Sequence, residues 1–445
     1  MIELAQRNNG SNEPERIPPG WSWRELRELG EIVTGTTPST ACQDYYGGPN
    51  LFISPGDIGL SRLVTTSAKT LTQAGLSVCR RLPRNSVMVV CIGATIGKVA
   101  MTGGDDCATN QQINSIIPNQ DVSPDFVYYA LKHRSPELPS LAGRAAVPIV
   151  NKSNFSRFTA AFPPLDEQRA IAHVLRTVQR AEEATEKVIA AARQLKASLR
   201  RHLFTYGPVP VQKAVPGKLS EAENGSIPHH WKTMRLVDLL REPLRNGHSA
   251  KATNTHEGIR TLTLTAVTQN DFSIGNTKLT VAAPERVRGM WLRSGDILVE
   301  RANTPEYVGL AALYEGPDDF AIYPDLMVRV RVKPDLVLPK YLAEYLLIEK
   351  CRAYFRSKAK ATAGNFPKID QGVIEETRIP IPAKGEQDQV VDAFRKIDRK
   401  VRVEVQRSKA LAALFGSLLH HLMTGKVRVK DLNLPDPRHG GIAIG

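Results

Sequence analysis

The stretch GATIGK, from Gly93 to Lys98, has the composition of a phosphate-binding loop, with two glycines and a lysine that could hold a nucleotide phosphate. Its spacing argues against that chemistry. Only three residues separate the glycines, and Val99 occupies the position where a serine or threonine would bind the metal ion. We expect a pair of turn glycines at the end of a strand instead.

Other reactive side chains lack the partners that catalysis requires. The histidine pairs at 229–230 and 420–421 have no further residues at metal-ligand spacing. The charged step DRK at Asp398–Lys400 lies inside a long helical pattern, where we expect a solvated face. The sequence contains no dinucleotide-binding glycine loop, no Asn/Asp-Pro-Pro-Tyr box of amino-methyltransferases and no nuclease motif of an acid with E-x-K. We therefore expect no catalytic residue, metal or cofactor in this chain, and interpret it as a binding protein.

Composition indicates what such a protein would bind and where. Lysine and arginine outnumber aspartate and glutamate by 59 to 45, a net charge of +14 that favours a polyanion as partner. The five cysteines form no C-x-x-C pair, which is typical of a reducing compartment. The longest apolar run, around VMVVCIGATIG, is too short to cross a bilayer, and no secretion signal opens the chain. We expect a cytoplasmic protein.

A chain of 445 residues exceeds one ordinary core, and its segments repeat in order. The spacing between matching segments grows from 210 to 215 to 219 residues, as loop insertions would produce. The matches are IPPGWSWREL with IPHHWKTMRL, LPRNSVMVV with LRSGDILVE, SPDFVYYAL with LPKYLAEYL, and DEQRAIAHVL with GEQDQVVDAF. The sequence therefore predicts a tandem duplication.

Each half predicts a globular part followed by a long helix. Short apolar runs separated by Gly, Pro and Thr favour an α+β fold. From Ile171 a heptad runs through Val178, Thr185, Ala192 and Leu199, with a companion series at Val174, Ala181, Val188, Leu195 and His202. The second copy alternates three and four residues from Val390 to Leu422. So narrow an apolar stripe needs a partner helix, and two matched helices in one chain favour an antiparallel coiled coil with pseudo-twofold symmetry.

The resulting domain boundaries follow the chain in order. We expect a first globular domain at 1–163, a spacer helix at 164–206, a Pro- and Gly-rich linker at 207–228, a second globular domain at 229–383, a second spacer helix at 384–426 and a loose tail at 427–445.

This organisation resembles the specificity subunit of type I restriction–modification systems. The resemblance rests on PPLDEQRAIAHVL (Pro163–Leu175), LKASLRRHLFTYG (Leu195–Gly207), EQDQVVDAF (Glu386–Phe394), SLLHHLMTGKVRV (Ser417–Val429) and the Trp-led segment GWSWRELRELGEIVTGTTPS (Gly20–Ser39). It covers nearly the whole chain. Two segments depart from the family pattern: IPIPAKGEQ replaces Pro-Pro-Leu at the second junction, and the second half lacks the T-P-S turn of the first.

The resemblance implies a non-catalytic subunit with two target-recognition domains. Each would read one half of a split DNA target, and the helix pair would set the spacing and dock two methyltransferase subunits. Restriction subunits with translocase and nuclease activity could join the complex. S-adenosylmethionine, ATP and Mg²⁺ would then belong to the partner subunits. An alternative from another class is a coiled-coil scaffold whose globular domains do not read DNA sequence; sequence-selective, salt-sensitive duplex binding separates the two.

Base edges and phosphates are contacted mainly by Arg, Lys, Asn, Gln, Ser and Thr. On that basis we select loop residues of these types, each of which has an ordinary loop role as its alternative. The candidates are Thr36, Thr37, Ser39, Lys98, Asn110, Gln111, Arg144 and Lys152 in the first domain, and Arg245, Lys251, Arg301, Asn303, Lys360, Asn365 and Lys368 in the second.

Overall fold

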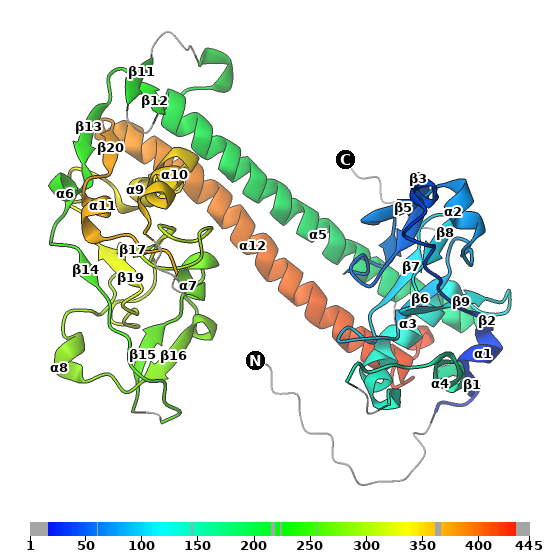
Figure 1. The fold of residues 1–445 in the computed structure, drawn as a ribbon. Helices are drawn as coiled ribbons and strands as arrows, with labels where there is room; N and C mark the ends of the chain where they lie inside the picture. The colour runs from blue at the N-terminus through cyan, green and yellow to red at the C-terminus, as the bar shows by residue number, and fades with distance from the viewer. Residues whose placement is uncertain are drawn as a thin grey trace. The chain divides into compact units, whose positions relative to one another are not determined.

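The structure is a computed structural model that describes residues 17–59, 61–143, 146–214, 219–222, 225–255, 257–360 and 366–432 (Figure 1). The chain divides into two compact units that do not follow the sequence order of the domains. One unit contains Ile189–Val403, and the other contains the described residues before 189 and after 403. Each unit therefore holds one globular domain and one half of each long helix.

The first globular domain joins three sheets, one of them the antiparallel pair β1-β10, to short helices. Its strands are β1 (Ser22–Glu25), β2 (Gly30–Thr34), β3 (Tyr46–Ile53), β4 (Leu63–Val64), β5 (Lys69–Leu71), β6 (Val87–Val90), β7 (Val99–Thr102), β8 (Cys107–Thr109), β9 (Ile113–Pro118) and β10 (Thr159–Phe162). Its helices are α1 (Leu26–Leu29), α2 (Gln73–Ser77), α3 (Pro124–Arg134) and α4 (Lys152–Arg157), with 3-10 turns η1 (Gln43–Tyr45) and η2 (Ser135–Leu141). The largest sheet has the order β2-β9-β6-β7-β4, and β5-β3-β8 forms a smaller one.

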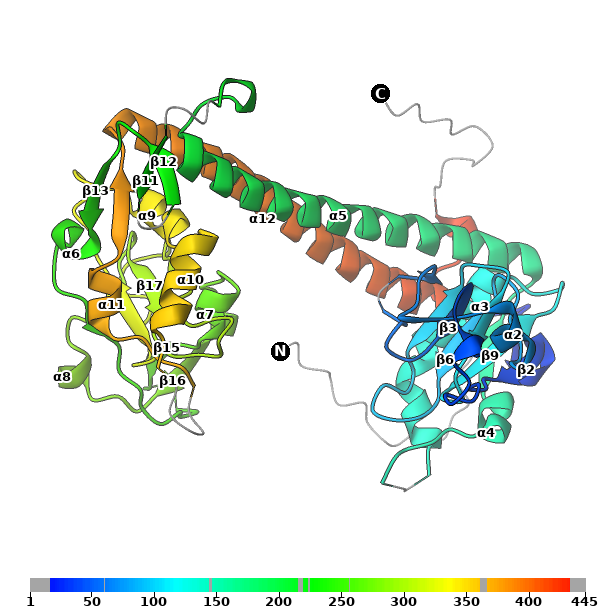
Figure 2. The same ribbon diagram turned by 45° about the horizontal axis from the view of Figure 1, so that its top comes forward.

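The second globular domain has a similar central sheet. Its strands are β13 (Lys232–Arg235), β14 (Arg245–Asn246), β15 (Ile259–Leu262), β16 (Thr277–Thr280), β17 (Ile297–Glu300), β18 (Ala311–Leu313), β19 (Met327–Val330) and β20 (Arg378–Ile381). Its helices are α6 (Leu236–Leu239), α7 (Thr265–Thr268), α8 (Pro284–Val287), α9 (Pro339–Tyr345), α10 (Glu349–Lys358) and α11 (Gln371–Glu375), with the 3-10 turn η5 (Ile274–Asn276). Apolar residues of α9, α10, β17 and β19 belong to one core. The helices α9 and α10 lie beside β17 in Figure 2.

The two central sheets have the same strand order, which confirms the duplication at the level of topology. In the first, β9 lies between β2 and β6, and β7 follows β6; in the second, β19 lies between β14 and β17, and β18 follows β17. All of these pairs are antiparallel. The sequence matches LPRNSVMVV with LRSGDILVE fall on β6 and β17, as a common origin requires.

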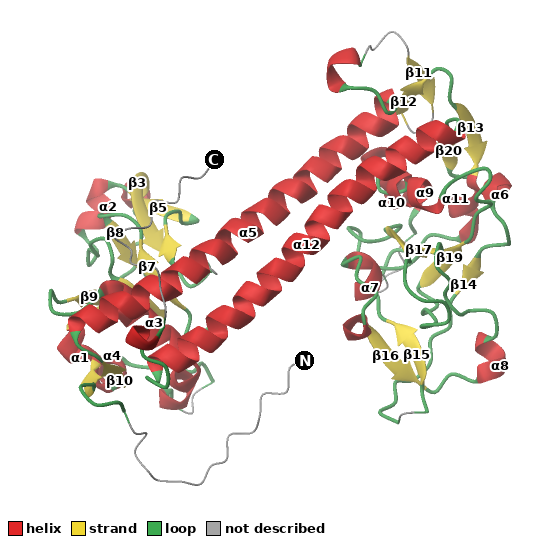
Figure 3. Ribbon diagram, turned by 180° about the vertical axis from the view of Figure 1, so that it is seen from behind, coloured by secondary structure: helices red, strands yellow, loops and turns green. Residues whose placement is uncertain are grey.

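The long helices are continuous and pair in opposite directions within each unit. Helix α5 spans Leu165–Tyr206 and α12 spans Lys384–Met423. In the first-domain unit the start of α5 packs on the end of α12 through Ile171, Leu175 and Phe415. In the second-domain unit the end of α5 packs on the start of α12 through Phe204 and Phe394, whose ring centroids are 6.2 Å apart. The two helices lie side by side in both views (Figures 1 and 3).

The expected companion series on α5 is wrong in the middle of the helix. Val188 is 41% exposed and Leu195 is 59% exposed, whereas Ile189 is buried. The first series through Thr185 does face inward. The second inward series is therefore one residue later than expected. Period counting missed this because Glu182 and Lys196, two charged residues, occupy that series.

Segments outside the two domains also contain local structure. The expected linker 207–228 contains the 3-10 turn η3 (Val211–Lys213) and a hairpin of β11 (Leu219–Ala222) and β12 (Gly225–Pro228). Beyond α12, the tail forms the 3-10 turn η6 (Val429–Asp431). Among the described residues, no helix is both long and apolar enough to cross a membrane.

Candidate functional site

The repeated Glu-Gln step fixes each long helix to its globular domain. Gln168 is 2% exposed; its Oε1 accepts from the Ser123 backbone N–H at 2.9 Å, and its Nε2 donates to the Pro163 carbonyl at 2.9 Å. Gln387 repeats these bonds in the other unit, accepting from the Leu338 backbone N–H at 2.8 Å and donating to the Pro382 carbonyl at 3.2 Å. The same glutamine therefore joins the start of a spacer helix to the start of α3 or α9.

The neighbouring glutamate joins the Trp-led segment to the same junction. Glu167 accepts from Trp21 Nε1 at 3.3 Å and forms two hydrogen bonds with Arg428, at 2.6 and 2.7 Å. In the other unit Glu386 lies 3.1 Å from His230 Nε2, next to Trp231. The segments that carry the sequence resemblance therefore form one structural junction in each half.

A loop-bearing sheet edge is the candidate binding surface of the first domain. The ends of β2 and β6 and the starts of β7 and β9 lie at this edge, because Thr34 pairs with Asn114, Val90 with Ile113 and Val89 with Val99. The connecting loops that begin or end here carry most of the polar candidates of this domain.

Contacts at this edge bring several candidates together. Thr37 Oγ1 donates to Gln111 Oε1 at 2.5 Å, and the Thr36 backbone N–H donates to the Thr109 carbonyl at 2.8 Å. Asn110 and Gln112 form reciprocal contacts of 3.0 and 3.1 Å. Thr37 and Gln111 are exposed, so their polar groups face solvent.

The loop before α4 reaches the same edge. Ile149 pairs with Ile92, and the Gly93 backbone N–H donates to the Pro148 carbonyl at 3.0 Å. Lys98 is exposed beside Gly97, and Lys152 is exposed at the start of α4. Ser39 is exposed before η1, four residues beyond Gly35, and Arg144 lies outside the described residues. Gly97 has φ +93°, so GATIGK is a turn between β6 and β7, as expected.

The corresponding edge of the second domain carries four of its candidates. Asn246 pairs with Val328 and Glu300 with Met327, which places the ends of β14 and β17 and the start of β19 together. Lys368 bridges to both Ala302 and Lys360, so Arg301, Asn303, Lys360 and Lys368 gather beside the end of β17. Asn365, between the two lysines, lies outside the described residues.

Two further candidates of the second domain are placed elsewhere or otherwise engaged. Arg245 donates to the carbonyls of Arg288 at 2.9 Å and Gly289 at 3.4 Å, which gives its guanidinium a structural role. Lys251 is exposed beside β16, where the Val281 backbone N–H donates to its carbonyl at 3.0 Å.

Glu300 is a residue that the sequence analysis missed at this edge. Its side chain is fully buried at the end of β17, where its Oε2 accepts from Asn303 Nδ2 at 2.5 Å. Asn303 Oδ1 in turn accepts from the Thr304 backbone N–H at 2.7 Å, so Asn303 also holds the loop in this structure. Burial raises the pKa of Glu300 to about 7, although the Asn303 hydrogen bond and the Arg352 charge lower it. The sequence feature that could have identified Glu300 is an acidic residue at the end of the apolar run DILVE.

Some buried polar atoms without hydrogen-bond partners lie at the two edges, and others, such as Ser115 Oγ and Trp231 Nε1, lie elsewhere. Among the described residues, Thr36 Oγ1 and Thr109 Oγ1 at the first edge have no hydrogen-bond partner, nor do Glu300 Oε1, Arg301 Nε and Thr304 Oγ1 at the second. Such groups cost free energy when buried, and a bound ligand or water molecule would supply the missing partners. Aromatic Tyr307 and Phe366, 44% and 59% exposed, flank the second edge.

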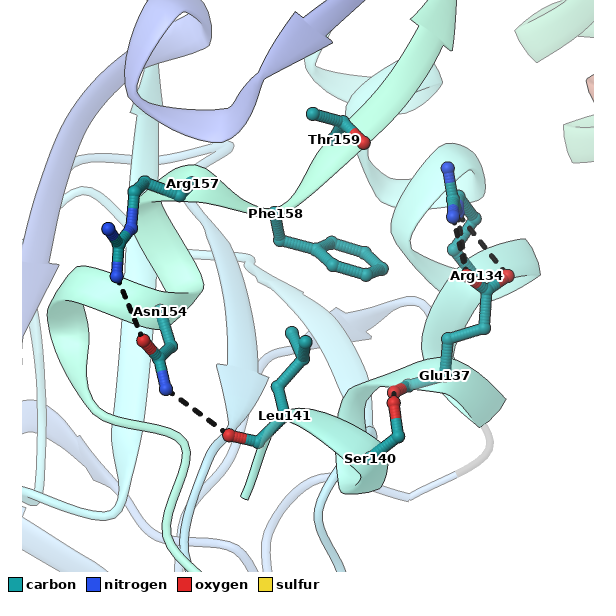
Figure 4. Close-up of a pocket in the computed structure, with 8 residues that line it drawn as sticks. All are labelled: Arg134, Glu137, Ser140, Leu141, Asn154, Arg157, Phe158 and Thr159. Carbon is teal, nitrogen blue, oxygen red and sulfur yellow. Dashed lines mark hydrogen bonds and ion pairs between the residues drawn. The ribbon is translucent and has the colours of Figure 1, made fainter. Parts of the chain in front are cut away.

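A separate pocket of about 480 Å³ lies between α4 and η2 of the first domain (Figure 4). Its polar side chains are bonded to one another: Arg134 pairs with Glu137, Arg157 Nη2 donates to Asn154 Oδ1 at 3.2 Å, and Asn154 Nδ2 donates to the Leu141 carbonyl at 3.3 Å. These groups do not converge on a common point as a catalytic set would. No metal-binding group of three His, Cys, Asp or Glu occurs among the described residues.

Comparison with known proteins gives a consistent result. The family described as "Type I restriction modification DNA specificity domain" matches residues 18–193 and 228–413. The MjaIX specificity subunit of Methanocaldococcus jannaschii is 25% identical over 64% of this chain, which spans about 63% of that relative's length. The MjaVIII specificity subunit of the same organism is 22% identical over 94% of this chain and 95% of its own. The S subunit crystal structure from M. genitalium has a TM-score of 0.58 at 15% identity, covering 94% of this chain and 98% of that one, which shows a shared fold.

Proposed function

Because the chain belongs to the type I restriction–modification DNA specificity family, we infer that it is the sequence-reading subunit of such a complex. Each globular domain reads one half of a split DNA target through the sheet edge described above. The remaining steps of restriction and modification belong to partner subunits.

The equivalence of the two edges carries this proposal. The strands β2, β9, β6 and β7 of one domain correspond in order to β14, β19, β17 and β18 of the other. The ends and starts that carry polar loops are also the same in both. A duplicated surface with different loop residues suits two different DNA half-sites. The same sheet supports the loops in both domains, and the different loop side chains contact different bases.

The side chains at the edges have the chemistry that duplex DNA requires. Amide and hydroxyl groups such as Thr37 and Gln111 can read base edges, while Lys98, Lys360 and Lys368 can bind phosphates. The net charge of +14 adds a long-range attraction for the duplex. The unpaired buried atoms at both edges are consistent with loops that complete their hydrogen bonds on binding.

The spacer helices give the proposed complex its geometry and its partners. We assign them two roles: setting the number of unread base pairs and docking two methyltransferase subunits at the Glu-Gln junctions. S-adenosylmethionine would be bound by those subunits, and ATP and Mg²⁺ by restriction subunits where these are present. The chain itself then contributes binding and orientation, without a reacting group of its own.

The proposal is tested by the methylation pattern of cells that contain the chain with its methyltransferase. Substituting Thr37→Ala and Gln111→Ala should change or relax only one half of the methylated motif. Substituting Arg301→Ala and Lys368→Ala should affect only the other half. Random methylation, or motifs unaffected by either pair, would favour a scaffold whose domains do not read sequence.

A further inference from the structure

The two ends of the helix pair are held by different chemistry at equivalent positions. In the second-domain unit the end of α5 lies in a charged junction, formed by Lys196, Arg200, Lys340, Glu344 and Asp398. In the first-domain unit the end of α12 lies in an aromatic junction, formed by Asp125, Tyr129, Gln179, Phe415 and Leu419. The repeat offsets of 215 and 219 residues place these two sets of five at the same positions in the two halves.

The charged junction is a compact, partly buried network around Glu344. Lys196 Nζ lies 2.7 Å from Glu344 Oε1 and 2.6 Å from Asp398 Oδ1. Arg200 Nη2 lies 2.7 Å from Glu344 Oε2, and Lys340 Nζ lies 2.6 Å from Asp398 Oδ2. The Glu344 side chain is only 4% exposed. Burial would raise the pKa of Glu344, but the charges of Lys196, Arg200 and Lys340 outweigh burial and lower it.

The aromatic junction has no charge at four of its five positions. Tyr129 lies where the other half has Glu344, and its ring is 6.1 Å from the ring of Phe415, which replaces Lys196. Tyr129 Oη donates to Gln179 Oε1 at 3.0 Å, where the other half has Asp398. Leu419, 9% exposed, replaces Arg200. The fifth position, Asp125, is already paired with Arg62 and Arg176.

If the two helix ends were exchanged, charged side chains in both junctions would lack partners of opposite charge. The end of α5 would bring two cations against Tyr129 and Gln179, where the one nearby carboxylate already has two arginine partners. The end of α12 would bring Phe415 and Leu419 against Glu344 and Asp398, leaving one buried and one partly buried carboxylate with Lys340 alone. Removing one side of a buried ion pair is strongly destabilising, because a charge stays buried without its partner.

We propose that the two junctions form a pairing code in which each domain accepts only one helix end. The first domain binds the end of α12, and the second domain binds the end of α5. An α5 helix from a second copy of the chain therefore cannot replace α12. Given the proposed function, this code keeps two different recognition domains in one complex and excludes a pair of identical ones.

The test is a cycle of substitutions in the full chain, followed by thermal unfolding. The helix-end exchange carries K196F, R200L, F415K and L419R. The junction exchange carries E344Y, D398Q, Y129E and Q179D, with K340M to remove the cation that loses its carboxylates. Each exchange alone should lower the unfolding temperature by about 10 °C or more, and the combined variant should regain at least half of that loss.

Two results would overturn the pairing code. The first is a helix-end exchange as stable as the natural chain. The second is a combined variant that is no more stable than the weaker single exchange. Recovery of stability in the combined variant requires that the helix end matches the junction, and residues with only a general packing role would not produce it. The control is R193F with R201L, which removes two exposed cations from the same helix and should change the unfolding temperature little. The measurement needs no DNA, so its failure is distinct from failure of the proposed function.

Discussion

Replacing the repeated glutamine tests the junction that the sequence motif encodes. In Gln168→Met, the Ser123 backbone N–H and the Pro163 carbonyl lose their side-chain partner in a buried site, while the volume of the side chain is nearly kept. Gln387→Met removes the partner of the Leu338 backbone N–H and of the Leu336 and Pro382 carbonyls. Both glutamines are at most 2% exposed, so water cannot replace the lost bonds without local opening.

The cost follows from the number of groups left unpaired. Each buried donor or acceptor without a partner costs about 1–3 kcal/mol, so two groups in Gln168→Met cost about 2–6 kcal/mol. For a unit of roughly 200 residues, 1 kcal/mol moves the unfolding temperature by about 2–4 °C. We therefore expect a fall of about 4–24 °C for each variant, measured by calorimetry on the full chain. Gln387→Met, with one more bond, should lie at the upper end.

Because the chain has two units, the unfolding assay can show which unit a substitution destabilises. If they unfold separately, Gln168→Met should move the transition of the first-domain unit and Gln387→Met the other. Exposed glutamines of the same helices supply matched controls, Gln194→Met on α5 and Gln389→Met on α12. A fall below about 1 °C in both junction variants, equal to that of the controls, would refute this account of the Glu-Gln step.

Two further predictions concern the second sheet edge. Because the pKa of Glu300 is raised from 4.5 to about 7, the native state holds the Glu300 proton more tightly than the unfolded state does. The resulting contribution to the free energy of unfolding is present at pH 4.5 and is lost as pH rises through 7. Glu300→Gln should remove this loss, of order 2–3 kcal/mol, from urea unfolding measured between pH 5 and 8; an unchanged pH profile would contradict the assignment. Lys368→Ala should reduce the slope of log Kd for duplex DNA against log salt concentration by about 1, whereas Lys251→Ala should not; equal slopes for both would place the second edge elsewhere.

The long helices and the duplication were predictable because their signals repeat. The apolar heptad spacing of both helices, the absence of Gly and Pro from Asp166 to Phe204, and the same Glu-Gln step 219 residues apart identify these elements from local sequence. The companion series failed at Val188 and Leu195 because packing against α12 admits Glu182 and Lys196 at inward positions. Lys196 is stabilised at its inward position by a charged network that spans α5, α9 and α12. The hydrophobic pattern of a single helix does not reveal this network.

The sheet edges were predictable only in part. Residues in loops that begin or end at the strand ends, such as Thr37, Gln111 and Lys368, fall at the edges because strand order places them there. Asn303 and Arg245 have the residue types expected of a DNA contact, but their hydrogen bonds serve the domain itself. Glu300 was missed because its role depends on burial and on an Asn303 contact that the sequence does not reveal.

The proposed division of labour, in which each globular domain reads one half of a split DNA target, can be tested with a chimaera. In this chimaera residues 17–163 come from another recognition domain of the family, and the methylated motif is determined. We expect one half of the motif to change, while the other half and the number of unread base pairs stay the same. A change in both halves, or in neither, would contradict it.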